Sequence, residues 1–105
     1  MKAKVGSPFY VSPEILQGKE YTPAVDIWAI GVILYTMLTG FMPFGGEDMK
    51  ELFKSIINTE LDLEQFNKIS SEAKDFLQRL LTKDPKKRIT VTEALRHLWI
   101  QQHTS

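Results

Sequence analysis

The stretch of residues 27–38 constrains the fold most, because it is apolar on nearly every side of a helix. Thr22 and Pro23 before it suit a helix start, and Gly40 after it suits a helix end. Its large apolar residues leave no wide polar face: Trp28, Ile30, Val32, Ile33, Leu34, Tyr35, Met37 and Leu38. A helix of this kind is buried in a core or a membrane, and this stretch, interrupted by Gly31, is too short to span a bilayer. We therefore predict a buried central helix.

Four other segments carry helix signals. A short helix starts at Ser12 and Pro13, where Ser12 is the expected cap, and ends at Gly18. Two apolar stripes have helical spacing: Met49, Leu52, Phe53, Ile56 and Ile57, then Ala73, Phe76, Leu77, Leu80 and Leu81. A last helix starts at a capping box of Thr90 and Glu93. Its expected core stripe is Val91, Ala94, Leu95, Leu98 and Trp99. No segment alternates like a strand, so we predict a mainly α fold of about five helices around the central one, without a substantial sheet.

The composition argues against several kinds of partner. Thirteen basic residues balance thirteen acidic ones, which gives no electrostatic reason to expect nucleic acid or an anionic membrane surface. There is no cysteine, and His97 and His103 are not spaced to bind one metal ion from a helix face. No apolar leader is visible. We predict a protein of the cytoplasm, or else of the nucleus, without a metal, a membrane or nucleic acid as a partner.

Five short motifs follow one another along residues 5–100. They are Gly6-Ser7-Pro8-Phe9-Tyr10-Val11-Ser12-Pro13-Glu14, Asp26-Ile27-Trp28-Ala29-Ile30-Gly31-Val32, Thr39-Gly40-Phe41-Met42-Pro43-Phe44, Asp84-Pro85-Lys86-Lys87-Arg88-Ile89-Thr90 and His97-Leu98-Trp99-Ile100. In this order and spacing they resemble the C-terminal part of the large lobe of a eukaryotic serine/threonine protein kinase. The first is similar to the end of the activation segment, the loop that leads into the kinase Ala-Pro-Glu motif. Two departures from the family pattern are Ser12 for that Ala and Leu98 for the Pro of His-Pro-Trp.

Within the kinases, the resemblance is closest to the calcium- or calmodulin-regulated group. It rests on residues 10–16, 26–35 and 69–76. A regulatory domain or a calmodulin-like partner is therefore implied for the complete enzyme. The chain contains no EF-hand loop of its own.

The resemblance implies two sets of site residues. The loop that binds a protein or peptide substrate would consist of Gly6, Ser7, Pro8, Tyr10 and Val11. The structural motif residues would be Ser12, Pro13, Glu14, Asp26, Trp28, Gly31 and Arg88. Ser7 stands where most kinases of this class carry Thr, and it keeps the hydroxyl that would contact a catalytic Asp and Lys.

Three of the motif residues carry specific expectations. Spacing alone favours Glu14 and Arg88 as separate surface charges, but the resemblance implies that they form an ion pair, for which arginine has the matching bidentate geometry. In the family, the residue at Asp26 accepts hydrogen bonds from a catalytic loop that this sequence lacks. We therefore expect water or the N-terminus of its own helix to satisfy Asp26. Trp28 is expected to pack beneath Pro13.

The sequence lacks the residues that phosphoryl transfer requires. Transfer needs a glycine-rich phosphate loop, a His-Arg-Asp loop and an Asp-Phe-Gly motif, and none of these occurs in the 105 residues. We predict no catalytic residue and no cofactor site in this chain, with ATP and Mg²⁺ bound elsewhere in a complete kinase. We also expect uncovered apolar surface around Ile30, Ile33 and Met37.

We thus predict that residues 1–105 are a partial kinase domain. Residues 1–14 would end the activation segment, residues 12–100 would form the helical subdomain, and residues 101–105 would be a tail. The expected function is a fragment that supplies the substrate loop and helical scaffold of a serine/threonine kinase and is inactive alone. One alternative is a non-catalytic interaction module that offers residues 47–57 and 6–14 to a protein partner. Another is a helical domain unrelated to kinases.

Overall fold

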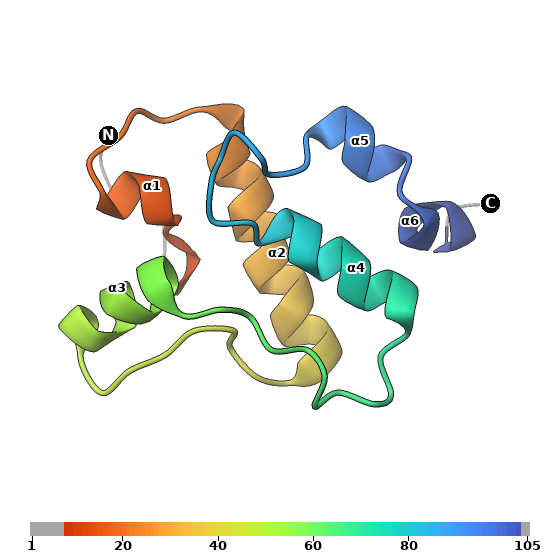
Figure 1. The fold of residues 1–105 in the computed structure, drawn as a ribbon, viewed down its shortest axis with the longest axis horizontal. Helices are drawn as coiled ribbons and strands as arrows, with labels where there is room; N and C mark the ends of the chain where they lie inside the picture. The colour runs from red at the N-terminus through yellow and green to blue at the C-terminus, as the bar shows by residue number, and fades with distance from the viewer. Residues whose placement is uncertain (1–7, 104–105) are drawn as a thin grey trace.

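The computed structural model describes residues 8–103, which form six α-helices and one short 3₁₀ helix, with no strand among them (Figure 1). The elements are η1 Pro8–Tyr10, α1 Pro13–Leu16, α2 Pro23–Thr39, α3 Met49–Asn58, α4 Ser71–Leu80, α5 Val91–Leu95 and α6 Leu98–His103. The mainly α fold predicted from the sequence is confirmed. No helix among these residues is long and apolar enough to cross a bilayer.

The helix α2 is the centre of the molecule. Figure 1 shows α1 and α3 on one side of α2, with α5 and α6 on the other and α4 packed along it. Its start is as expected, because the Thr22 hydroxyl accepts a hydrogen bond from the Ala24 amide and Pro23 occupies the first turn. It ends at Gly40, whose φ of 83° is a left-handed conformation that favours glycine.

The core lies between α2 and its neighbours α3 and α4. Trp28, Val32, Ile56 and Leu77 are completely buried there. Gly31 lets α4 approach closely, since a Cβ atom at this position would lie 2.9 Å from the Leu80 Cβ atom. This contact explains in packing terms why a glycine interrupts an otherwise strongly apolar helix.

One face of α2 remains open. Ile30, Ile33 and Met37 are 51%, 45% and 75% exposed, respectively. The expectation of uncovered apolar surface at these three residues is confirmed. The prediction of a buried helix therefore holds for the face that carries Trp28 and Val32, and not for the opposite one.

The single last helix predicted from residue 90 onward is wrong. The chain forms two short helices, α5 and α6, because the helical hydrogen bonding stops at Arg96 and a new helix begins after His97. His97 starts α6 by accepting a hydrogen bond from the Trp99 amide at 3.0 Å. The break moves the expected core stripe off one face, so Val91, Leu95 and Leu98 are exposed while Trp99 is half-buried.

The helix starts show which capping predictions hold. The Thr90–Glu93 capping box is present, with hydrogen bonds of 3.2 and 2.9 Å in its two directions. Asp48 and Ser70 cap α3 and α4. Ser12, in contrast, makes no capping hydrogen bond to α1, so that expectation is wrong. Pro13 at the first position of α1 lacks an amide hydrogen, which leaves one fewer donor to satisfy.

Candidate functional site

The candidate site is built on a buried ion pair between Glu14 and Arg88. The Arg88 Nη1 and Nη2 atoms lie 2.7 and 2.8 Å from the two carboxylate oxygens of Glu14. The Glu14 side chain is 2% exposed and the Arg88 side chain is 0% exposed. The pair implied by the resemblance is therefore present, although 74 positions separate its members in the sequence.

Arg88 uses all five of its N–H groups. Besides Glu14, its Nε and Nη atoms donate to the backbone carbonyls of Thr82, Ala24 and Lys83 at 2.8, 2.8 and 3.0 Å. These carbonyls belong to the start of α2 and to the chain that follows α4. One guanidinium group thus holds together α1, α2 and the connection from α4 to α5, and no part of it is left without a partner.

The charge state of Glu14 follows from two opposing effects. Burial raises the pKa of its carboxyl group, but the hydrogen bonds and the charge of Arg88 outweigh burial and hold the pKa below its ordinary value. The Ser12 hydroxyl adds to this lowering, although it does not reach the geometry of a hydrogen bond. Glu14 is therefore charged at neutral pH, and the contact is a true ion pair.

An aromatic and cationic stack lies beside this pair. The guanidinium carbon of Arg88 is 5.0 Å from the Trp28 ring centre, and Trp28 stacks on Phe44 at 5.6 Å. Lys83 completes the group, with its ammonium nitrogen 4.5 Å from the Phe44 ring centre. The indole nitrogen of Trp28 has no hydrogen-bond partner among the described residues. The stack places positive charge on ring faces, which attract cations.

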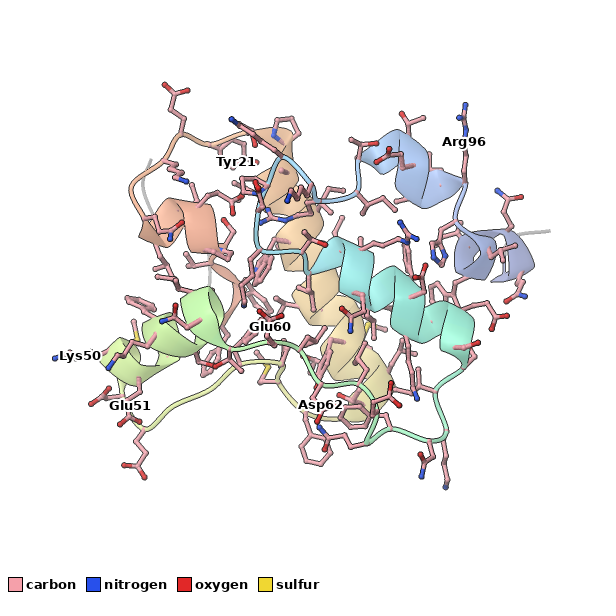
Figure 2. All side chains as sticks on the ribbon, in the orientation of Figure 1. Tyr21, Lys50, Glu51, Glu60, Asp62 and Arg96 are labelled. Carbon is pink, nitrogen blue, oxygen red and sulfur yellow. The ribbon has the colours of Figure 1, made fainter. Side chains whose placement is uncertain are left out.

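Asp26 has a different partner from the one expected. Its carboxylate is exposed and accepts a hydrogen bond from the Tyr21 hydroxyl at 2.7 Å. The expectation that only water or the helix N-terminus would satisfy Asp26 is therefore wrong, because the loop before α2 brings a tyrosine to it. This hydrogen bond raises the pKa of Tyr21. Figure 2 shows Tyr21 at the start of α2.

The predicted substrate loop is described only in part. Gly6 and Ser7 lie outside the described residues. Pro8 begins η1, which packs against α2. Tyr10 is exposed and Val11 is half-buried. The buried residues Ser12 and Pro13 then lead into Glu14, so the loop enters the scaffold at the ion pair.

A second polar cluster lies between α4 and the start of α6. The Asp75 carboxylate receives hydrogen bonds of 2.7 Å from Arg79 and from the Nε2 atom of His97. These contacts hold the pKa of Asp75 below its ordinary value. The His97 ring also contacts the Phe76 ring at a tilt of 38°, with ring centres 4.8 Å apart. The cluster fixes the break between α5 and α6, which explains how the chain turns there.

Two site residues carried no signal in the sequence. Lys83 stands beside the Asp84 motif without belonging to it, and Tyr21 lies in an unremarkable loop. Lys83 acts through a hydrogen bond to Ile56, 27 positions away, and Tyr21 through one to Asp26, 5 positions away. No group of three or more His, Asp or Glu residues able to hold a metal ion occurs in the part of the chain that the structure describes.

Comparison of the sequence with known proteins identifies the family. The protein kinase domain family matches residues 1–100. The human calcium/calmodulin-dependent protein kinase type 1B is 49% identical over 102 residues, covering 95% of this chain and 30% of the human protein. Calcium-dependent protein kinase 29 of Arabidopsis thaliana is 47% identical over 98 residues, covering 91% of this chain and 18% of that kinase. Calcium-dependent protein kinase 10 of rice (Oryza sativa subsp. japonica) is 46% identical over 99 residues, covering 92% of this chain and 16% of the rice kinase.

The chain thus spans less than a third of the length of these relatives. Its helical fold, its buried Glu14–Arg88 pair and its similarity over nearly all of its residues agree with one another. The chain belongs to the protein kinase domain family, in the calcium-regulated serine/threonine kinase group.

Proposed function

We propose that this chain is the substrate-side helical part of a serine/threonine protein kinase. In it, residues 6–11 contact a protein or peptide substrate, and the scaffold of residues 12–100 holds that loop in place. The observation that carries the proposal is the complete use of Arg88, whose five N–H groups join Glu14 at the end of the loop to three backbone carbonyls of the scaffold. Such a junction limits the movement of the loop. A loop that holds a substrate must position the serine or threonine hydroxyl of that substrate accurately.

The chemical step belongs to other residues of a complete kinase. The chain has no glycine-rich phosphate loop and no His-Arg-Asp or Asp-Phe-Gly motif. We therefore propose that ATP and Mg²⁺ are bound outside these 105 residues.

The partners follow from the same proposal. A protein carrying a serine or threonine would be the substrate of the complete enzyme. A regulatory domain or a calmodulin-like protein would control it, since the human relative is a calcium/calmodulin-dependent kinase and the Arabidopsis relative is a calcium-dependent kinase.

An interaction module without catalysis is a second candidate. The observation in its favour is a groove of about 380 Å³ beside α2, lined only by apolar side chains from α2, α4, α5 and α6. Exposed apolar surface of this kind is typical of surfaces that bind another protein segment.

A chimeric kinase tests the main proposal. The 102-residue matching segment of the human type 1B kinase is replaced by the corresponding part of this chain. We expect the chimera to phosphorylate a serine peptide with Mg²⁺ and ATP, and the isolated 105-residue chain to transfer no phosphate. An Arg88→Met chimera should lose activity by about tenfold or more, because Glu14 then loses its partner and the loop its anchor.

Lys86→Met is the matched control, because Lys86 is an exposed lysine in the same connection as Arg88. That chimera should keep its activity. Transfer by the isolated chain, or a chimera that melts cooperatively but is inactive while its parent is active, contradicts the proposal and favours the interaction module.

A further inference from the structure

Lys83 reaches from the end of α4 to the end of α3. Its Nζ atom donates a hydrogen bond of 2.7 Å to the carbonyl oxygen of Ile56. The helix α3 ends at Asn58, and the Thr59 amide binds the preceding carbonyl, that of Ser55. The Ile56 carbonyl is therefore among the last ones that the helix itself cannot satisfy, and a cation is favourable at this negative end of a helix.

The same ammonium group lies on an aromatic surface. It is 4.5 Å from the centre of the Phe44 ring and 5.6 Å from that of Trp28. The planes of these two rings differ by 11°, so the rings are stacked, and the ammonium group lies close to both. A cation on such a face is attracted by the negative charge above the rings. Three separate features thus accept the charge of Lys83: a helix end and two ring faces.

The charged groups around Lys83 are few. Burial lowers the pKa of its ammonium group, and the nearby Glu60 carboxylate opposes this change. Figure 2 shows Glu60 where the chain leaves α3 towards the centre of the molecule. Arg88 is the other cation on the Trp28 ring, and it is fully paired with Glu14. Lys83 is therefore the group in this stack whose charge can change below the range of an ordinary lysine.

The backbone of Lys83 belongs to the central ion-pair network. Its carbonyl oxygen accepts the 3.0 Å hydrogen bond from the Arg88 Nη2 atom. One residue thus contacts both α3, through its side chain, and the group that anchors the loop before α1, through its backbone. The segments on both sides of α3, residues 40–48 and 59–70, form no helix, and each contributes one buried core residue, Phe44 and Leu63.

We propose that Lys83 is a positioning residue that holds the C-terminal end of α3 on the Trp28–Phe44 stack and links it to the Glu14–Arg88 anchor. The outer end of α3, where Lys50 points away from the molecule in Figure 2, is thereby set relative to the loop of residues 8–11. The idea that the position of α3 relative to this loop helps to bind a protein rests on the proposed function. The idea that Lys83 positions α3 does not depend on the proposed function.

Hydrogen exchange in the full 105-residue chain tests the placement. Lys83→Met keeps the aliphatic stem and removes the charge, and Lys83→Arg keeps the charge. We expect the Lys83→Met variant to exchange its amides at residues 55–59 about tenfold faster, with the α4 amides unchanged, because one charged hydrogen bond and one cation–ring contact are lost. Lys83→Arg should restore most of the protection, and the control Lys86→Met should match the wild type.

A second readout separates positioning from general support. In nitrogen-edited NMR spectra, the indole N–H signal of Trp28 should move as the pH rises towards the ordinary lysine range, because Lys83 loses its charge there. The signal should stay in place in Lys83→Arg, whose side chain remains charged. Unchanged exchange in Lys83→Met, an equal rise throughout α4, or a Trp28 signal that moves equally in Lys83→Arg would each overturn the proposal. None of these measurements depends on kinase activity, so they fail independently of the proposed function.

Discussion

The two faces of α2 have similar apolar side chains and opposite surroundings. On one face, Trp28 and Val32 are completely buried, and Trp28 lies next to a fully paired guanidinium group. On the other, Ile30, Ile33 and Met37 are largely exposed and line an apolar groove. Hydrophobicity therefore indicates which residues can be buried, while the elements packed around the helix decide which of them are.

The faces also differ in how their contacts resist change. The buried face depends on a charge that is costly to leave unpaired and on a close helix contact at Gly31. The open face depends on no specific partner among the described residues. Substitutions on the two faces should therefore have very different effects on the free energy of unfolding.

The largest effect is expected from Arg88→Met. This change leaves the Glu14 carboxylate buried without its partner, and the free energy of unfolding should fall by about 3–5 kcal/mol. Urea denaturation followed by circular dichroism measures it. The double variant with Glu14→Gln should recover part of the loss, because the orphaned charge is then gone. A single variant as stable as the wild type would show that the pair contributes nothing to the buried face.

A smaller loss is expected from Gly31→Ala. The added Cβ atom would lie 2.9 Å from atoms of Leu80 and Leu81, so α4 must move away from α2. Overpacking of this kind costs about 1–3 kcal/mol, which exceeds the helix-propensity gain of about 1 kcal/mol from replacing glycine. Thermal denaturation of the two proteins measures the difference. A stabilised Gly31→Ala variant would mean that the two helices do not touch at this position.

The third effect is the pH dependence that comes from Glu14. Its pKa is lowered in the folded protein, so its contribution is fully present above the unfolded pKa of about 4.5 and is lost as pH falls through the folded value. The free energy of unfolding should therefore decrease more steeply below that pH in the wild type than in Glu14→Gln. Denaturation curves between neutral and acidic pH measure both slopes, and identical slopes would contradict the lowered pKa.

The smallest effect on stability is expected on the open face. Ile33→Lys should change the free energy of unfolding by no more than about 0.5 kcal/mol, as for other exposed positions. Exposed apolar surface favours self-association, and we expect Ile33→Lys to reduce it because the change introduces charge into the apolar groove. Sedimentation velocity and urea denaturation test the two parts. A large loss of stability would show that this face is packed after all, and the contrast between the two faces would disappear.

Much of the helical scaffold could be predicted from local signals. The start and end of α2 follow from Thr22, Pro23 and Gly40, and the presence of α3 and α4 follows from apolar spacing, signals that act within one or two turns of chain. The break between α5 and α6 could not, because it depends on His97 acting as a cap while its ring binds Asp75 from α4. The stripe of Val91, Leu95 and Leu98 therefore had helical spacing without a core to face.

The sequence by itself determined the all-helical character, the central helix and the resemblance to kinases, because caps, periodicity and motif order are written along the chain. The resemblance implied the Glu14–Arg88 pair, whereas only the tertiary structure decided that Tyr21 binds Asp26 and that Lys83 spans two helices. Spacing alone favoured surface charges at residues 14 and 88, since contacts between distant residues leave no local pattern. The Glu14–Arg88 pair forms inside the protein because a charge can be buried only where the fold gathers enough partners around it.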